Sequence, residues 1–134
     1  MSLQAEIAAY LVSSGVATAM GTDLFAYLPD GGSTLVMAIY ETGGVEADQN
    51  FTTGPVVSMP SFQFVVRSAT ANDYAAARAK MKAAYDALHL IDNESLSGTM
   101  YYDVRAIDEP APIRRDETQR VIIGCNFMAR KAVS

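Results

Sequence analysis

The sequence predicts an α+β fold in which a mixed, mainly antiparallel sheet carries two helices packed on one face. Segments 2–12 and 73–89 repeat apolar residues at spacings of three and four, which is typical of amphipathic helices. Segments 61–68, 99–107 and 119–130 instead alternate in character, as half-buried strands do. Because only two helices stand among several strands, they are expected to cover one side of a single sheet.

Length and composition favour one globular domain over residues 1–134. Half of the 134 residues are apolar and 19% are charged, which is enough for a single core without disulfides or metal. The sequence contains no apolar run of membrane-spanning length and does not begin with the basic segment of a secretion signal. We therefore expect a soluble, intracellular protein that does not enter a membrane.

The N-terminal third is predicted to contain a helix and a hairpin. Ser2 is a good N-cap, and the helical spacing of apolar residues persists to about Val12. Segments 23–29 and 34–41 both read as strands. Between them, Asp-Gly-Gly-Ser at 30–33 has the composition of a tight turn, so the two strands are expected to pair in an antiparallel hairpin.

Segment 42–60 has no regular periodicity and is expected to be a long loop. It contains three glycines, two prolines and few apolar anchors. A connection of this length is usually functional, disordered or part of an assembly contact. Glu46, Asp48 and Phe51 are therefore candidate assembly residues, although a surface loop or an extension of the hairpin arms without a role would fit the same composition.

The next two elements are a strand over 61–68 and a helix over 73–89. Alternation in the strand places Phe62, Phe64 and Val66 on a core-facing side and leaves Val65 and Arg67 nearer solvent. The helix is rich in alanine, and an apolar stripe marks its buried face. The stripe consists of Tyr74, Ala77, Met81, Tyr85 and Leu88.

The C-terminal part is predicted to hold two strands separated by a break. Residues 92–94 precede the strand over 99–107. Its alternation places Met100, Tyr102, Val104 and Ala106 on one face and Thr99, Tyr101, Asp103 and Arg105 on the other, where Asp103 with Arg105 is expected to pair with charges on a neighbouring strand. The strand could run parallel to 61–68 across a helical crossover. Pro110 and Pro112 are expected to interrupt regular pairing. The strand over 119–130 places Val121, Ile123, Cys125, Phe127 and Ala129 on one face, opposite Ile122, Gly124, Asn126 and Met128. Its first half is apolar on both faces, so it should be central or covered, and Gly124 indicates a bulge or the close approach of another backbone.

The residues that could carry out chemistry point to no active site. Cys125 lies within an apolar run and is expected to be a small core residue, and His89, the only histidine, is expected to cap a helix or lie on the surface. The spacing of the nearby acids matches no known metal-binding motif, so a solvated turn is preferred for them. Those acids are Asp108, Glu109, Asp116 and Glu117. We expect no catalytic residues, cofactor or metal.

Charge is distributed unevenly along the chain. The first 66 residues carry six acids and no base, whereas the remainder carries ten bases and nine acids. The net charge of −5 argues against sequence-specific DNA binding, which requires a concentrated basic face. The asymmetry either favours self-association between unlike surfaces or has no spatial meaning. A charged corner before the last strand is either a solvated turn or an intersubunit contact; it comprises Arg114, Arg115, Asp116, Glu117 and Arg120.

Several ordered segments resemble one known family. They are Pro-Ser-Phe-Gln-Phe-Val-Val-Arg-Ser at 60–68, an alanine-rich helix ending in Ala-Leu at 87–88, and Gly-Thr-Met-Tyr-Tyr at 98–102. The proline-containing 107–113 follows, and then Asp-Glu-Thr-Gln-Arg at 116–120 leads to Asn-Phe-Met-Ala at 126–129. Together, over about 57–131, they resemble the tail terminator, or minor capsid, proteins that form part of the neck of tailed bacteriophages.

The resemblance implies a structural virion protein with no catalysis and no cofactor. It implies a ring, typically a hexamer, that caps the tail tube protein and joins it to the head connector protein, after assembly in the host cytoplasm. DNA would pass through the lumen without sequence-specific binding. Another neck or tail-tube subunit is the alternative within assembly proteins. A small-molecule-binding domain or enzyme using the polar faces near Asp103 and Arg105 is a further alternative from another class.

Overall fold

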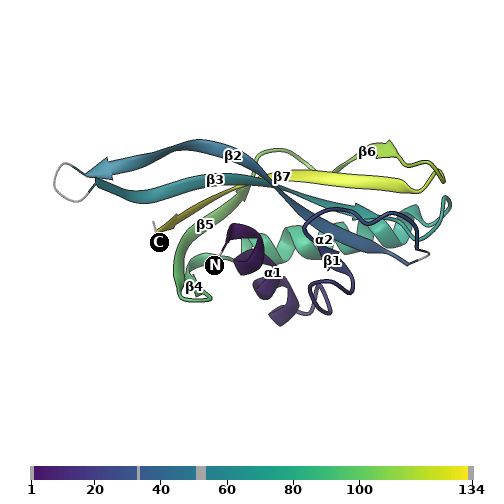
Figure 1. Cartoon of the computed structure of the whole chain (residues 1–134), viewed down its shortest axis with the longest axis horizontal. Helices are drawn as coiled ribbons and strands as arrows, with labels where there is room; N and C mark the ends of the chain where they lie inside the picture. The colour runs from purple at the N-terminus through teal and green to yellow at the C-terminus, as the bar shows by residue number, and fades with distance from the viewer. Residues whose placement is uncertain (1, 33, 51–53, 133–134) are drawn as a thin grey trace.

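The chain folds into one curled sheet with both helices against the same face (Figure 1). The computed structural model describes residues 2–32, 34–50 and 54–132. Within these ranges it contains two helices and seven strands, which confirms the predicted α+β class. In chain order the elements are α1 (Leu3–Ser13), β1 (Leu24–Phe25), β2 (Val36–Asn50), β3 (Gly54–Arg67), α2 (Tyr74–His89), β4 (Asp92–Leu96), β5 (Thr99–Ala106), β6 (Ala111–Arg115) and β7 (Val121–Ala132).

The strands follow the spatial order β1-β2-β3-β7-β5-β4, and β6 also pairs with β7. The first half of β7 pairs with β6 and the second half with β5, while β3 lies along its other edge. Only the named pair β1 and β2 is parallel, so the sheet is mixed and mainly antiparallel, as predicted. β3 and β5 run in the same direction, as a crossover through α2 requires, but β7 separates them.

The helices form where the sequence predicts them. The Ser2 hydroxyl accepts a hydrogen bond from the Ala5 amide at 3.1 Å, which caps α1. Alanine and leucine residues bury one side of α2 against the sheet, although Tyr74 at its start is 37% exposed. The predicted core face of α2 is therefore confirmed from Ala77 onward.

The centre of the core lies between β3, β7 and the two helices. Phe62 and Phe127 stack with ring centroids 5.3 Å apart, and both are fully buried. The predicted inward faces of both strands are confirmed by the burial of Phe64 and Ile123. Cys125 is buried beside them, as expected of a small core residue.

The opposite face of the sheet is more covered than the alternation predicts. Val65 and Arg67 were expected nearer solvent, yet only 2% and 4% of their surfaces are exposed. Val65 packs with Ala38 and Ile122 in a second apolar cluster, with Leu28 against it. The prediction is wrong there because the connection before β2 lies over this face, which a strand's own pattern cannot reveal.

The predicted hairpin between 23–29 and 34–41 is wrong. β1 is only two residues long and runs parallel to β2, whose antiparallel partner is β3. The described part of the expected turn at 30–33 is instead held by side chains from distant strands, because Arg67 and Arg120 donate hydrogen bonds to the carbonyls of Pro29, Gly31 and Gly32. Local turn composition was outweighed by these long-range contacts.

Segment 42–60 is not a loop in its described part. Residues 42–50 continue β2 and residues 54–60 continue β3, which is the extended-hairpin alternative. Register shifts after Glu41 and Val45 interrupt the alternation, and glycines at 43 and 44 adopt positive φ. Because of these irregularities, apolar and polar residues do not alternate regularly here, so the sequence pattern did not indicate strands. Phe51 lies outside the described residues.

Two further strands were missed. Residues 92–94, for which no strand was predicted, belong to β4, and the proline-containing segment is β6, which pairs with β7 despite Pro112. A strand at the edge of a sheet tolerates proline because one side of its backbone needs no partner. Gly124 admits a close neighbour, but that neighbour is a side chain, since a Cβ there would lie 2.2 Å from Ile113 Cδ1.

The predicted phase of β5 is also wrong at its start. A register shift between Tyr101 and Asp103 turns Tyr101 inward together with Val104. Met100, which was expected on the apolar face, is 38% exposed. A bulge changes which side chains share a face, and alternation alone does not locate it.

Candidate functional site

The charged corner before β7 is built around Asp116. Its carboxylate accepts hydrogen bonds from the amides of Thr118 and Arg120 at 3.0 and 2.9 Å and from Arg120 Nε at 2.8 Å. Partial burial raises the pKa of Asp116, but these hydrogen bonds lower it more, so its pKa falls below the ordinary value. Asp116 is therefore a structural acceptor that closes the turn.

Arg120 and Arg67 fasten the corner to the connection that covers the sheet. Arg120 Nη1 donates to the Gly32 and Gly31 carbonyls at 2.8 and 3.2 Å, and Arg67 Nη2 donates to Gly31 at 2.9 Å. Arg67 Nη1 also donates to the Pro29 carbonyl. Burial, followed by the charge of Arg120, lowers the pKa of Arg67. Both arginines have intramolecular roles that sequence inspection did not assign.

The remaining corner residues face outward. Arg114 and Glu117 are exposed, and Arg115 donates from Nη1 to the Gln119 and Ala71 carbonyls at 2.6 and 3.3 Å while staying exposed. The structure thus divides the predicted cluster into an inner pair, Asp116 and Arg120, and three outer residues. An intersubunit role for the outer three stays a prediction.

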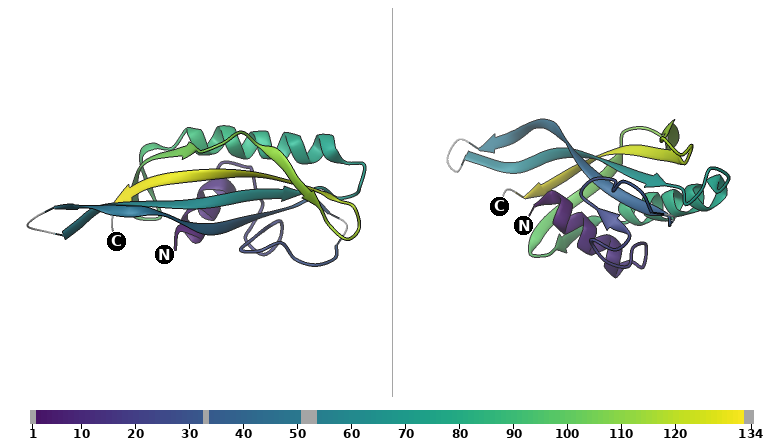
Figure 2. Two further views of the ribbon diagram at one scale, coloured as in Figure 1. Left: turned by 90° about the horizontal axis from the view of Figure 1, so that it is seen from above. Right: turned by 45° about the vertical axis from the view of Figure 1, so that its right-hand side comes forward.

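The second candidate surface is the arm, which we define as residues 42–50 of β2 and 54–60 of β3. It extends away from both helices (Figures 1 and 2). β1 pairs with β2 only at Met37 and Ala38, so over the described residues from Ile39 to Asn50 no strand covers the outer edge of β2. Glu46 and Asp48 belong to this edge strand.

At the base of the arm the backbone changes direction. Gly44 pairs with Pro60 and has a φ of 116°, a conformation that favours glycine. A Cβ at this position would lie 2.3 Å from the Met59 carbonyl oxygen, which is too close for any real side chain. The direction of the arm therefore depends on glycine at position 44.

A buried ion pair lies where α1 meets the end of β7. Lys131 Nζ is 3.4 Å from Glu6 Oε1, and the Tyr101 hydroxyl donates to the same oxygen at 2.8 Å. Burial raises the pKa of Glu6, but Thr99, Tyr101 and Lys131 together lower it more, so the net direction is downward. Helical spacing had given no signal for this pair, because its partners are far apart in sequence.

Asp103 on β5 pairs with a charge on the neighbouring strand β7, as expected from its polar face. Asp103 Oδ2 lies 3.5 Å from Arg105 Nε and 3.7 Å from Arg130 Nε on the neighbouring β7. Both arginines are largely exposed, so the pairs contribute little to stability. They show no substrate-binding geometry.

The side chains that could carry out chemistry, those of His89, Cys125 and Asp108, have structural partners. His89 Nδ1 lies 2.9 Å from the Tyr85 carbonyl oxygen, and Nε2 accepts a hydrogen bond from the Ala106 amide, so the ring links α2 to β5. Burial raises the pKa of the Cys125 thiol to about 12, which makes it a poor nucleophile. Asp108 accepts from the Asn126 amide and side chain, both at 2.9 Å.

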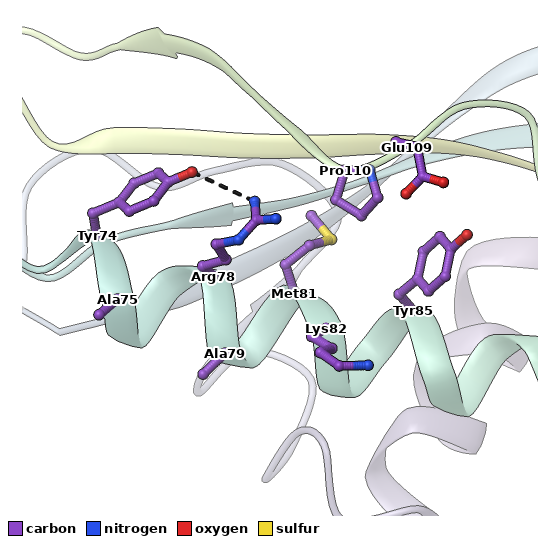
Figure 3. Close-up of a pocket in the computed structure, with 9 residues that line it drawn as sticks. All are labelled: Tyr74, Ala75, Arg78, Ala79, Met81, Lys82, Tyr85, Glu109 and Pro110. Atoms are coloured by element: carbon purple, nitrogen blue, oxygen red, sulfur yellow. Dashed lines mark hydrogen bonds between the residues drawn. The ribbon is translucent and has the colours of Figure 1, made fainter.

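An apolar groove runs along α2 opposite the start of β6 (Figure 3). It encloses about 470 Å³ between the helix and the Glu109–Pro110 backbone. Met81 lies at its floor, Tyr74 and Tyr85 stand at its two ends, and Arg78 points into it. We call this cavity the α2 groove. No group of three or more metal-ligating side chains occurs among the described residues, there or elsewhere.

The comparisons with known proteins identify the family of the chain. Residues 10–132 match the family model described as bacteriophage tail terminator protein, and the chain belongs to that family. The family is structural and non-enzymatic, so the protein is a tail component of a virion and not an enzyme. No protein with a curated description matches the sequence.

A solved structure shows the same fold. It is a chain of the virion of a native gene transfer agent particle, with 21% identity and a TM-score of 0.69. The alignment covers 98% of this chain and 96% of the other. No helix in the described part of this chain is long and apolar enough to cross a membrane.

Proposed function

We propose that this tail terminator forms a closed ring, a hexamer, that caps the tail tube protein and joins it to the head connector protein. The observation that carries the proposal is the outer edge of β2 from Tyr40 to Asn50, with which no other described strand pairs; at Ile39 the carbonyl already accepts a hydrogen bond from the Gln4 side chain at 2.7 Å. An open strand edge of this length offers unpaired backbone groups to another chain. The register shifts within β2 limit uncontrolled pairing, so the edge suits one specific partner.

A ring needs two different surfaces on each subunit. In a closed head-to-tail assembly, one surface of each copy meets another surface of the next. The arm and the end of β6 with its connection to β7 lie at opposite ends of the long axis of the molecule (Figure 1). Arg114, Arg115 and Glu117 belong to that end of β6 and to the connection. The arm is acidic in sequence and the corner is rich in arginine, so unlike surfaces are available for such contacts.

The same charge balance favours passage of DNA through the lumen without sequence-specific binding. Six copies of a chain with net charge −5 carry about −30. A lumen of that sign repels phosphates and lets DNA slide. A strongly positive lumen potential in the assembled ring would contradict this part of the proposal.

Sedimentation of the purified protein, alone and with tail tubes, tests the ring. We expect a species of about six subunits, and electron microscopy should place it at one end of each tube. A strictly monomeric protein under both conditions would refute the ring. Rings located along the tube or within the head would instead favour another neck or tail-tube role.

A further inference from the structure

The α2 groove is more than a gap between elements. Its walls are largely apolar, from Met81, Pro110 and the two tyrosines, and one wall carries a cation (Figure 3). Arg78 Nη1 lies 3.5 Å from the Tyr74 hydroxyl and forms no salt bridge within the described residues. Lys82, one turn further, pairs with Asp86 at 2.9 Å.

The groove therefore offers an apolar floor and one cation without a carboxylate partner among the described residues. Among the described residues, Glu109 on the opposite wall is the one acid in its lining. A ligand with apolar residues and a carboxylate near Arg78 would bury the floor and complete the ion pair. The groove follows α2 from Tyr74 to Tyr85, which suits an extended segment better than a small molecule.

The arm of another copy has matching properties. Residues 42–60 include Glu46 and Asp48 and contain no lysine or arginine. The arm is extended, and its outer edge is uncovered over the described residues. In Figure 1 the arm points away from the body at one end, whereas the Tyr74 end of α2 lies at the other. An arm therefore lies away from the groove of its own chain, so an arm seated in the groove must come from another copy.

We propose that the acidic arm of one subunit docks in the α2 groove of the next and places a carboxylate against Arg78. This contact is heterologous, as a closed ring requires, and it rests on the ring proposed above. It assigns the groove to a second copy of this chain, not to a small molecule or the tail tube.

Charge exchange between the two surfaces tests the contact. Arg78→Glu and Asp48→Lys should each weaken ring assembly about tenfold in sedimentation or native mass spectrometry, and the double variant should recover most of the loss. Arg105→Glu, at an exposed arginine outside the groove, is the matched control and should assemble like the wild type. Circular dichroism of each monomer confirms that folding is retained.

Cross-linking gives a second measurement that does not depend on affinity. Cys125 is buried, so cysteines introduced by Ala79→Cys and Asp48→Cys would be the reactive thiols. A short bifunctional maleimide should join neighbouring subunits only when both substitutions are present.

Each result bears on a distinct claim. Wild-type rings with unchanged assembly of Arg78→Glu and no cross-link would overturn the groove contact and leave the ring intact. Normal rings that no longer bind tail tubes would assign the groove to the tube protein, which also overturns the contact. A monomeric wild type under all conditions would refute the ring, and the groove contact with it.

Discussion

Strands β2 and β3 form both the helix-covered centre of the sheet and the arm, yet different contacts determine the structure of these two regions. In the inner half, β3 contributes Phe62 and Phe64 to a core closed by both helices. In the outer half the strands extend beyond the helices (Figure 1). The comparison shows that the burial of side chains within one chain is enough to determine the structure of the inner half. In the outer half, no described strand covers the outer edge of β2, and this open edge leaves room for a partner chain to pair with it.

The largest expected effect on stability comes from removing an aromatic side chain at the centre of the core. Phe127→Ala should lower the free energy of unfolding by about 3–5 kcal/mol, because it deletes a fully buried side chain stacked on Phe62 and leaves a cavity. Urea denaturation measures the change. Phe127→Leu should cost clearly less. Equal losses for the two variants would show that cavity formation is not the cause.

The next effect should come from the buried ion pair. Lys131→Met should destabilise the fold by about 3 kcal/mol, because the buried Glu6 carboxylate loses its cation. Adding Glu6→Gln removes the stranded charge and should recover part of the loss. Failure of the second substitution to help, in the same denaturation assay, would mean that packing and not charge dominates this site.

The dependence of stability on pH tests whether the Glu6 carboxylate makes this contribution to stability. Because the folded-state pKa of Glu6 is lowered, its contribution is present above the unfolded-state pKa and is lost as pH falls through the folded-state pKa. Stability should therefore decline as pH drops below about 5. Glu6→Gln should make the decline shallower, although Asp108 and Asp116, whose pKa values are also lowered, keep part of it. An unchanged slope would exclude Glu6.

A substitution at the base of the arm is expected to have a smaller effect on the stability of the rest of the protein. Gly44→Ala places a Cβ against the Met59 carbonyl and should cost about 1–3 kcal/mol locally. Gly43→Ala is a matched control, since its φ is also positive but no atom lies within 4 Å of a Cβ. Hydrogen exchange should show lost protection in the arm for Gly44→Ala and little change around Phe127. Loss of protection throughout the sheet would show that the two halves are not separable.

The smallest effect on stability should come from the outer corner. Arg114→Glu combined with Arg115→Glu should leave thermal unfolding almost unchanged, because both side chains are exposed. Ring assembly measured by sedimentation should nevertheless weaken if the corner contacts a neighbour. Normal assembly would remove these two residues from the interface.

Sequence reasoning succeeded where one face of an element is buried and regular. The stripe of α2 and the alternation of β7 each follow a single period, so their inward residues were predictable. It failed where the outcome depended on distant partners. The guanidinium groups of Arg67 and Arg120 determine the path of the connection before β2, and nothing local to that connection indicates them.

The candidate site was only partly predictable for the same reason. The charged corner was visible as a cluster, but the division into an inner pair and outer residues depends on contacts between strands. The arm residues were named, although their strand conformation was hidden by bulges and glycines. The α2 groove gave no signal, because Pro110 meets the helix only in the folded chain.

The position of β7 has a consequence for how the protein forms. β7 lies between β3 and β5 and also holds β6, yet it follows every other element in sequence. Until residues 121–132 are added, β3 and β5 lack the strand that joins them. Such long-range pairing slows folding. The β2–β3 hairpin can form early from local contacts, whereas the complete sheet, and with it the corner, must wait for the last strand.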